Sequence, residues 1–181
     1  MLRLTTFVSA LALSAVAAFA ADIKVGVSPG EHAEIMEEVA KIAKPKGLNI
    51  EVVEFSDYVV PNQALADGDL NANSFQHQPY LDNQIRDRGF DLVSVAKTIT
   101  TPMGIYSSKL KSLEELKDGA KIAIPNDPTN GGRALALLAA NGAFRLTEGA
   151  DFRATVADVV ENPKRLRIIE LEAAQIQIGR A

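Results

Sequence analysis

The sequence contains no cysteine among its 181 residues. It can therefore form no disulfide, no thiolate zinc site and no cysteine nucleophile. Histidine is nearly as scarce, because His32 and His77 are the only two, and they lack the close spacing of a metal-binding pair. We therefore expect no transition-metal site and no cofactor. Neither a Walker loop nor a G-x-G-x-x-G fingerprint is present, and we expect a protein that is not an enzyme.

Long hydrophobic runs are confined to the N-terminus. Arg3 opens a basic segment, residues 4–17 are apolar or small, and Ala18-Phe19-Ala20 forms an A-x-A cleavage site. This pattern predicts a secretory signal peptide over residues 1–20, cut before Ala21. No later stretch has the length of a bilayer span, so we expect no stable membrane insertion after cleavage.

Basic charge is in deficit, with 19 Lys and Arg against 23 Asp and Glu, a net charge of −4. Residues 1–20 hold one Arg and no acid, so cleavage leaves 18 basic groups against 23 acidic ones, a net charge of −5. This balance disfavours nucleic acid as a partner. The remaining 161 residues (181 minus 20) suffice for one domain, or for one lobe and part of a second.

The mature chain opens with the pattern of an α/β fold. Residues 23–27 alternate like a buried strand, and a helix follows with an apolar face of Ile35, Val39 and Ile42. Residues 50–55 form the next predicted strand, so the two strands should be parallel. Four further elements are expected before residue 100: a short helix over 62–67, an extended stretch over 69–75, a helix over 79–88 and a strand over 92–99.

A break at Thr100-Thr101-Pro102 predicts a crossover into a second lobe. We assign residues 21–99 to the first lobe and residues 100–181 to the second, which is expected to be partial. Ser112 and Glu115 have the spacing of a capping box ahead of a short helix. The second lobe should also contain a weak helix over 155–160 and strands over 122–125 and 168–171.

The segment between Ile122 and Gly142 carries the clearest local signals. Its apolar strand breaks at two prolines and leads into an apolar helix over 134–140, with Asp127 or Thr129 as the N-cap. Asn141-Gly142 has the sequence of a helix C-cap.

Two features at the start of this helix disfavour its stability. Gly131 and Gly132 each cost up to ~1 kcal/mol relative to alanine, and Arg133 places a cation near the positive end of the helix dipole. A bound anion would account for both, because glycine lets the backbone approach it and Arg133 can hold it bidentately. Asn130 would add amide donors on the same face. A tight loop with a solvent-facing arginine explains the same residues equally well.

Phe75 and His77 lie two residues apart in the extended stretch, so their side chains should point to one face. Tyr58 follows an earlier strand, and such loops gather at the carboxyl ends of an α/β sheet. These three side chains could form a wall around a small apolar group. The alternative is ordinary core packing for Phe75 and a surface position for His77. Ser56, Asp57 and His77 could be imagined as a hydrolase triad, but their spacing gives that idea no support.

Several longer motifs resemble the methionine-binding NlpA lipoprotein family, the solute-binding components of methionine-importing ABC transporters. The resemblance runs from residue 23 to residue 175, and its motifs are Asp57-Tyr58-Val59-Val60-Pro61-Asn62, Asn73-Ser74-Phe75-Gln76-His77-Gln78-Pro79-Tyr80-Leu81-Asp82, Pro125-Asn126-Asp127-Pro128-Thr129-Asn130 with Arg133, Asp158-Val159-Val160-Glu161-Asn162-Pro163-Lys164 and Glu170-Leu171-Glu172-Ala173.

The resemblance implies a two-lobed, type 2-like periplasmic binding protein that captures methionine or a close analogue between its lobes. It would deliver this ligand to an inner-membrane ABC permease. By matching motif, Arg133 and Asn130 would hold the amino-acid carboxylate. Tyr58, Phe75 and His77 would surround the thioether, whose polarizable sulfur suits aromatic faces.

The sequence departs from the family pattern in two respects. Family members usually carry a lipobox cysteine after the signal, so we expect this protein to be unanchored in the periplasm. The match also stops near Gln175, which predicts an incomplete second lobe with too few elements to cover its apolar faces. The alternative function is therefore a truncated, non-transporting remnant that binds ligand weakly or not at all, or offers only an interaction surface.

Overall fold

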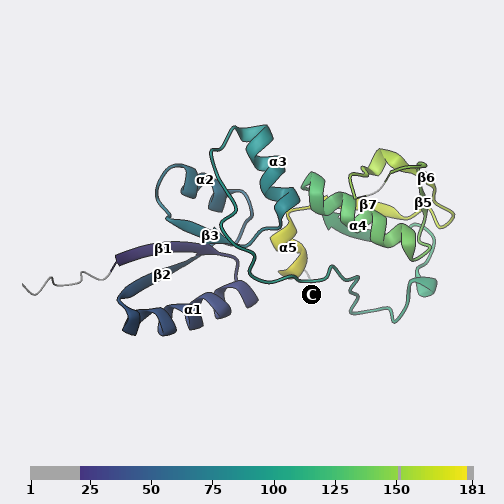
Figure 1. Cartoon of the computed structure of the whole chain (residues 1–181). Helices are drawn as coiled ribbons and strands as arrows, with labels where there is room; N and C mark the ends of the chain where they lie inside the picture. The colour runs from purple at the N-terminus through teal and green to yellow at the C-terminus, as the bar shows by residue number, and fades with distance from the viewer. Residues whose placement is uncertain (1–20, 151, 179–181) are drawn as a thin grey trace, which may run out of the picture.

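The backbone is organised around two parallel sheets at opposite ends of the molecule (Figure 1). The computed structural model describes residues 21–150 and 152–178, so the predicted signal peptide lies outside the described residues. One sheet has the strand order β2-β1-β3 and the other pairs β4 with β7. We call the part around the first sheet the first lobe, and the part around β4 and β7 the second lobe. The fold class is thus the predicted α/β type with two lobes.

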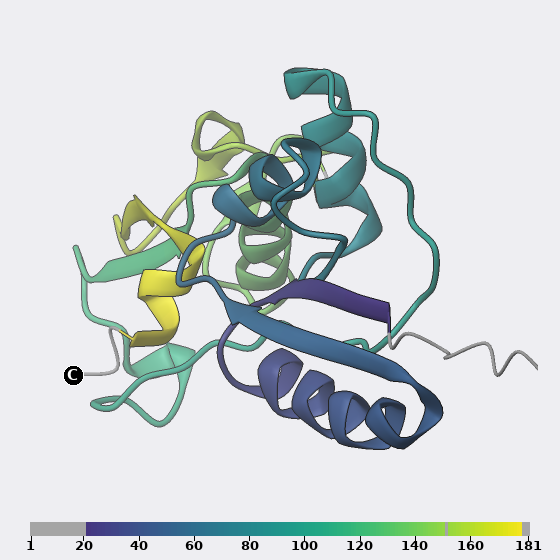
Figure 2. The same ribbon diagram turned by 90° about the vertical axis from the view of Figure 1, so that its left-hand side faces the viewer.

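In the first lobe, β1 pairs in parallel with β2 on one side and with β3 on the other. Figure 2 shows α1 beneath this sheet, with α2 and α3 on its opposite side. The predicted parallel strand–helix–strand unit is confirmed. The elements of this lobe are β1 (Ala21–Val27), α1 (Glu31–Ala43), β2 (Leu48–Glu54), α2 (Val60–Ala66), β3 (Ala72–Ser74) and α3 (Gln78–Arg88).

In the second lobe, α4 packs against β4, and a small antiparallel pair, β5 with β6, lies beside them (Figure 1). The predicted strands over 122–125 and 168–171 are confirmed as β4 and β7, which are parallel. The elements are β4 (Lys121–Pro125), α4 (Pro128–Ala140), β5 (Arg145–Leu146), β6 (Val159–Glu161), β7 (Arg167–Leu171) and α5 (Ala173–Ile178).

The predicted strand over residues 92–99 is wrong. The chain from Gly89 to residue 112 runs between the lobes without regular secondary structure. A strand needs a hydrogen-bonded neighbour, and β3 pairs only with β1 in the described part of the chain. The apolar alternation that suggested a strand is also solvated, since Val93 and Val95 are 77% and 87% exposed.

Two predicted helices in the second lobe are also corrected. The segment after Ser112 is a single 3-10 turn, Leu113–Glu115, and the Ser112 side chain makes no cap bond. The expected helix over 155–160 is a 3-10 turn, Val156–Asp158, followed directly by β6. A capping box does occur at this second turn, where Thr155 and Asp158 bond reciprocally.

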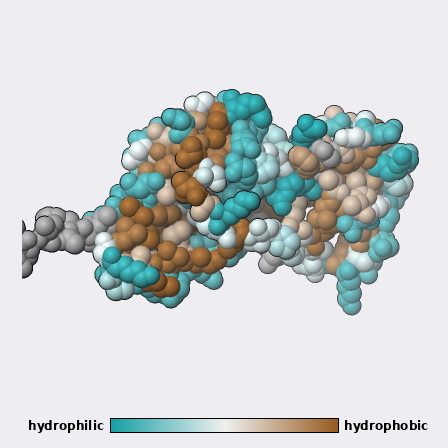
Figure 3. All heavy atoms as spheres, in the orientation of Figure 1, coloured by the Kyte–Doolittle hydropathy of each residue, from teal (hydrophilic) through white to brown (hydrophobic). Residues whose placement is uncertain are grey.

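The apolar face predicted for α1 exists but is not buried. Ile35, Val39 and Ile42 are 41%, 41% and 53% exposed, whereas Ala33 is buried and Met36 packs beside it against the sheet. The first-lobe core is correspondingly small, with Val25, Val27 and Ala33 as its buried residues. Figure 3 shows hydrophobic residues reaching the surface over the region of β1, β2 and α1.

The second lobe has the larger core, contrary to the expectation that it could not cover its apolar faces. Ile124 on β4 and Leu135 and Leu138 on α4 are 1–2% exposed, and Phe144 is 2% exposed. Residues 143–168 fold back over the helix and supply the cover that the sequence pattern did not reveal. No helix in the described part of the chain is long and apolar enough to cross a bilayer.

Candidate ligand-binding cleft

The segments that follow β1, β2 and β3 meet the start of α4 around one cavity of about 540 Å³. The carboxyl ends of parallel strands meet at one edge of a sheet, which is where α/β proteins bind ligands. The segment that links the lobes contributes to the lining as well. The lining residues are Ser28, Pro29, Glu31, His32, Tyr58, Phe75, Gln76, His77, Pro79, Tyr80, Ile99, Thr100, Thr101, Thr129, Asn130, Arg133 and Phe152.

On the second-lobe side, a chain of hydrogen bonds organises the start of α4. Asp127 is the N-cap, as one of the two predicted alternatives, and its Oδ1 accepts the backbone N–H of Asn130 at 2.8 Å. Thr129 supports the cap by donating its hydroxyl to Asp127 Oδ1 at 2.7 Å. Asn130 Nδ2 donates to Asp127 Oδ2 at 3.0 Å, and Asn130 Oδ1 accepts from Arg133 Nη1 at 2.9 Å. Arg133 is thus held in place by its own helix.

Arg133 forms no ion pair with any residue that the structure describes, although it is half-buried in the cavity wall. A half-buried cation at the positive end of a helix dipole is unfavourable unless an anion pairs with it directly. Its remaining donors can receive an anion, and a carboxylate matches the guanidinium geometry bidentately. The half-buried position of Arg133 in the cavity wall disfavours the alternative of a solvent-facing arginine and is compatible with the predicted anion site.

The two glycines of α4 have a different cause from the one predicted. A Cβ at Gly131 would lie 2.9 Å from the Pro125 carbonyl oxygen, and a Cβ at Gly132 would overlap the Phe152 carbonyl oxygen. Glycine is therefore required here by the protein's own backbone, which packs against the helix. This packing also brings Phe152 to the cavity lining.

On the first-lobe side, four rings form an aromatic wall. Tyr58 lies 5.9 Å from Phe75 between ring centroids, and Tyr80 lies 6.1 Å from Phe75 in an edge-to-face arrangement. The His77 ring is stacked on Tyr80 at 6.5 Å. Such spacings are those of favourable aromatic pairs. The wall presents polarizable faces to the cavity.

Hydrogen bonds at the backbone hold Tyr58 in this wall. Asp57 Oδ1 accepts the N–H groups of Val59 and Val60, both at 2.8 Å, which fixes the turn that enters α2. The Tyr80 hydroxyl donates to the Tyr58 carbonyl oxygen at 2.9 Å. Burial, aided by nearby carboxylates, raises the pKa of Tyr80 to about 12, so it stays a neutral donor.

His77 belongs to the aromatic wall and also feels the charges of the opposite wall. Burial lowers its pKa, the Arg133 guanidinium lowers it further, and the Asp127 carboxylate opposes the shift. His77 Nε2 is buried without a hydrogen-bond partner in the described structure. A buried imidazole nitrogen without a partner is unfavourable, so a small movement that brought a ligand or a water to it would be stabilising. The alternative of a surface position for His77 is not what the structure shows, because this residue is half-buried in the cavity wall.

All five residues predicted as a binding site line the same cavity: Tyr58, Phe75, His77, Asn130 and Arg133. Tyr80 was not among the predicted site residues, although it completes the aromatic wall one helical turn after His77. Phe152 was not predicted either, because its place depends on a contact with Gly132 that no local pattern signals.

A serine and a histidine share the cavity, yet they form no catalytic pair. Gly26-Val27-Ser28-Pro29-Gly30 matches the G-x-S-x-G pattern, which the sequence analysis overlooked. However, Ser28 Oγ and His77 Nε2 are both without a hydrogen-bond partner in the described structure, so they do not bond each other. Asp57, the acid of the imagined triad with Ser56, accepts the N–H groups of Val59 and Val60 in the turn before α2. The geometry gives hydrolysis no support.

A second hollow of about 540 Å³ lies beside the first halves of β1 and β2, but it is lined by charged side chains of both signs, such as Asp22, Lys24 and Glu51, and has no aromatic wall. The described residues contain no group of three His, Asp or Glu side chains placed to hold a metal ion.

Comparison with known proteins shows that this chain is similar to proteins named as methionine-binding. The D-methionine-binding lipoprotein MetQ of Salmonella typhi is 56% identical over 155 residues, which are 85% of this chain and 57% of that protein. MetQ of Escherichia coli K12 is 54% identical over the same shares. The crystal structure of a methionine-binding protein, MetQ, matches with a TM-score of 0.84 at 53% identity, over 87% of this chain and 64% of that chain. A nutrient-binding protein from Burkholderia cenocepacia bound to methionine matches with a TM-score of 0.82 at 52% identity, over 87% of this chain and 67% of that chain.

The chain spans about 57% of the length of the MetQ relatives that it matches. The family model described as NlpA lipoprotein matches residues 23–178, slightly beyond the predicted end at Gln175. The predicted resemblance is therefore confirmed, and the fold is that of a two-lobed periplasmic binding protein. The chain belongs to the NlpA lipoprotein family.

Proposed function

We propose that this protein is a periplasmic solute-binding protein that captures methionine, or a close analogue, in the cleft between its lobes. The observation that carries the proposal is the position of Arg133. This guanidinium forms no ion pair with a described residue, and it lies at the start of α4 in a cavity whose other side is an aromatic wall. A free amino acid with an apolar, sulfur-containing side chain matches both ends of that cavity.

In this proposal, Arg133 and Asn130 hold the ligand carboxylate. Asn130 acts mainly by orienting Arg133, because its Oδ1 accepts from the guanidinium and one of its amide donors is taken by Asp127. Tyr58, Phe75 and His77 surround the thioether, with Tyr80 behind them. The contacts of sulfur with aromatic rings contribute ~0.3–1.5 kcal/mol each.

The delivery of the ligand to an ABC transporter permease in the inner membrane is part of the same proposal. Relatives support it, since one matched structure is named as the periplasmic substrate-binding protein of an ABC transporter from Coxiella burnetii. An unanchored periplasmic location stays a prediction, because the MetQ relatives are named lipoproteins. A non-binding remnant is the less favoured function, because both walls of the cleft are present and the second lobe has a closed core.

Calorimetric titration of the purified chain with a panel of amino acids tests the proposal. L-methionine, D-methionine, norleucine, leucine and glutamate separate the contributions of the stereochemistry and of the side chain. We expect saturable binding of methionine that exceeds that of leucine and glutamate. Heat of dilution alone for every member of the panel would contradict the proposal.

A further inference from the structure

Asn62 is a fully buried amide that does not line the cavity, at 0% exposure on α2. It forms a reciprocal pair with Gln76, because Asn62 Nδ2 donates to Gln76 Oε1 at 2.8 Å and Gln76 Nε2 donates to Asn62 Oδ1 at 2.7 Å. Asn73 joins this pair by donating to Asn62 Oδ1 at 2.9 Å and to the Pro61 carbonyl oxygen at 3.2 Å. Three side-chain amides therefore link α2 to the end of β3.

The amide of Gln76 is fully engaged within this group. Its Nε2 donates both to Asn62 Oδ1 and to Asn73 Oδ1, the latter at 3.2 Å, and its Oε1 accepts from Asn62. Both amide hydrogens are thus used inside the protein. Although Gln76 lines the cavity, it has no donor left for a ligand.

Residues 75–77 lie between the end of β3 and the start of α3, outside regular secondary structure. No ladder sets the position of Phe75 and Gln76, whereas His77 is the N-cap of α3 and its carbonyl oxygen accepts two N–H groups of that helix. Side-chain bonds therefore carry more of the task of placing Phe75 and Gln76. Phe75 and His77 flank Gln76 in this short segment, and both belong to the aromatic wall. The hydrogen bonds that fix Gln76 therefore also restrict the positions of the two neighbouring rings.

We propose that Asn62 is a positioning residue for ligand binding: by fixing Gln76, it sets Phe75 and His77 in the aromatic wall. The effect on affinity rests on the proposed function, whereas the effect on His77 does not. The alternative role is structural alone, in which the three amides stabilise the first lobe without affecting the cleft. The two roles differ in what happens to the rings when Asn62 is removed.

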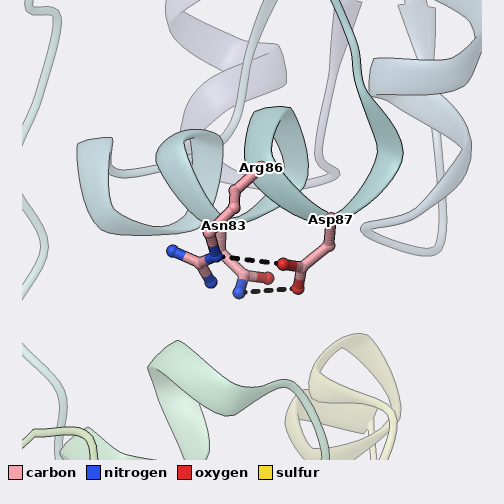
Figure 4. Close-up of polar contacts among 3 residues, drawn as sticks. All are labelled: Asn83, Arg86 and Asp87. Carbon is pink, nitrogen blue, oxygen red and sulfur yellow. Dashed lines mark hydrogen bonds and ion pairs between the residues drawn. The ribbon is translucent and has the colours of Figure 1, made fainter.

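The chain offers a matched control in Asn83, another buried asparagine that lies outside the cavity lining. Asn83 is 7% exposed on α3 and donates through Nδ2 to Asp87 Oδ2 at 2.9 Å. Figure 4 shows that Asp87 also receives Arg86, whose Nε lies 3.1 Å from Asp87 Oδ1. Asn83→Ala removes a buried amide, as Asn62→Ala does, but leaves Gln76 in place.

Two measurements on Asn62→Ala, Asn83→Ala and the parent protein test the inference. The first is the methionine dissociation constant by calorimetry, well below each melting temperature. We expect Asn62→Ala to weaken binding about tenfold, the effect of losing one buried hydrogen-bonded partner. Asn83→Ala should stay within about twofold, despite a comparable loss of melting temperature.

The second measurement is the titration of the two imidazoles by NMR without ligand. Burial holds the pKa of His77 below its ordinary value, so a looser segment 75–77 should let that pKa rise in Asn62→Ala. The pKa of His32 should stay unchanged in Asn62→Ala, and Asn83→Ala should change the pKa of neither histidine. If Asn62→Ala does not fold, Gln76→Ala is measured in its place, since this half-buried side chain tolerates truncation more easily.

The outcomes separate this inference from the proposed function. If the parent protein binds no methionine while the His77 titration moves in Asn62→Ala, the proposed function fails and the positioning role stands. If the parent binds methionine and Asn62→Ala binds it equally well, the inference is overturned. An unchanged His77 titration in a folded Asn62→Ala protein also overturns it, whatever the ligand does.

Discussion

The two walls of the cleft are built in different ways. The polar part of the second-lobe wall lies within residues 127–133, where Asp127, Asn130 and Arg133 are linked by hydrogen bonds at sequence separations of three. The first-lobe wall joins distant segments: Tyr80 bonds the backbone of Tyr58 at a separation of 22, and Asn62 bonds Gln76 at a separation of 14. One wall is organised by a single helix start, whereas the other exists only when the first sheet is folded.

The two walls also differ in the chemical groups that they offer to a ligand. The local wall offers a fixed charge, and the assembled wall offers polarizable surface. A charge–charge contact in a desolvated site contributes more than an aromatic contact with sulfur. We therefore expect affinity to depend mainly on the second-lobe wall and side-chain selectivity mainly on the first.

The largest expected effect is that of Arg133→Ala. Methionine binding should weaken by about 2–5 kcal/mol, because the buried ligand carboxylate then has no partner. Calorimetry measures the loss. Arg145→Ala is the control, since Arg145 is an exposed arginine paired with Glu161 at 2.7 Å, away from the cleft. Parent-like affinity in Arg133→Ala would show that the carboxylate site is elsewhere.

The next effect concerns the stability of the second-lobe wall. Helix propensity alone predicts that Gly132→Ala stabilises α4 by up to about 1 kcal/mol. The structure predicts the opposite sign, because the added Cβ would overlap the Phe152 carbonyl oxygen. Overpacking of this kind costs about 1–3 kcal/mol. Urea unfolding decides the sign, and a more stable Gly132→Ala protein would mean that the Phe152 segment can move away.

The local wall was accessible to sequence analysis, and the assembled wall only in part. The Asp127 cap and the end of α4 at Asn141-Gly142 follow from rules that act over a few residues, and both are confirmed. Phe75 and His77 were placed on one face by strand alternation. Tyr80, the Asn62–Gln76 pair and Phe152 were missed, because their contacts depend on how distant segments pack.

The failed predictions have the same origin. Apolar alternation over residues 92–99 indicated a strand, but a strand requires a neighbour that the local sequence does not specify. The apolar face of α1 was correctly recognised, but its burial depends on other parts of the fold, and Ile42 remains 53% exposed. Conversely, the core around Leu135 closes through residues 143–168, which carry no strong pattern.

A smaller effect should come from the aromatic wall itself. Phe75→Leu keeps an apolar side chain and removes the ring, so methionine should lose ~0.3–1.5 kcal/mol of binding free energy. Norleucine has the shape of methionine without the sulfur and serves as the matched ligand, so its affinity should change less. Calorimetry with both ligands gives the ratio of their dissociation constants in the parent and in the Phe75→Leu protein. An equal loss for both would show that Phe75 acts by shape and not through sulfur.

The smallest expected effect tests whether the two walls are independent. His77 belongs to the aromatic wall, yet burial and then Arg133 across the cleft lower its pKa. An imidazole with a lowered pKa stays neutral in the folded state while the unfolded state takes a proton. The free energy of unfolding should therefore fall as the pH drops from above about 6.5 toward the folded-state value. Urea unfolding across this pH range should show a smaller fall in the free energy of unfolding for the His77→Gln protein than for the parent.

His32 is the control. Burial lowers its pKa too, and Glu31 opposes that shift. His32→Gln should therefore remove a separate share of the pH-dependent fall in the free energy of unfolding. Glu114 and Asp158, whose pKa values are lowered by hydrogen bonds, act in the carboxyl range and lie below this window. Arg133→Ala removes the nearby cation, so NMR titration in that variant should show a higher pKa for His77 and an unchanged one for His32. If His77 titrates identically with and without Arg133, the walls are electrostatically separate, and only the ligand connects them.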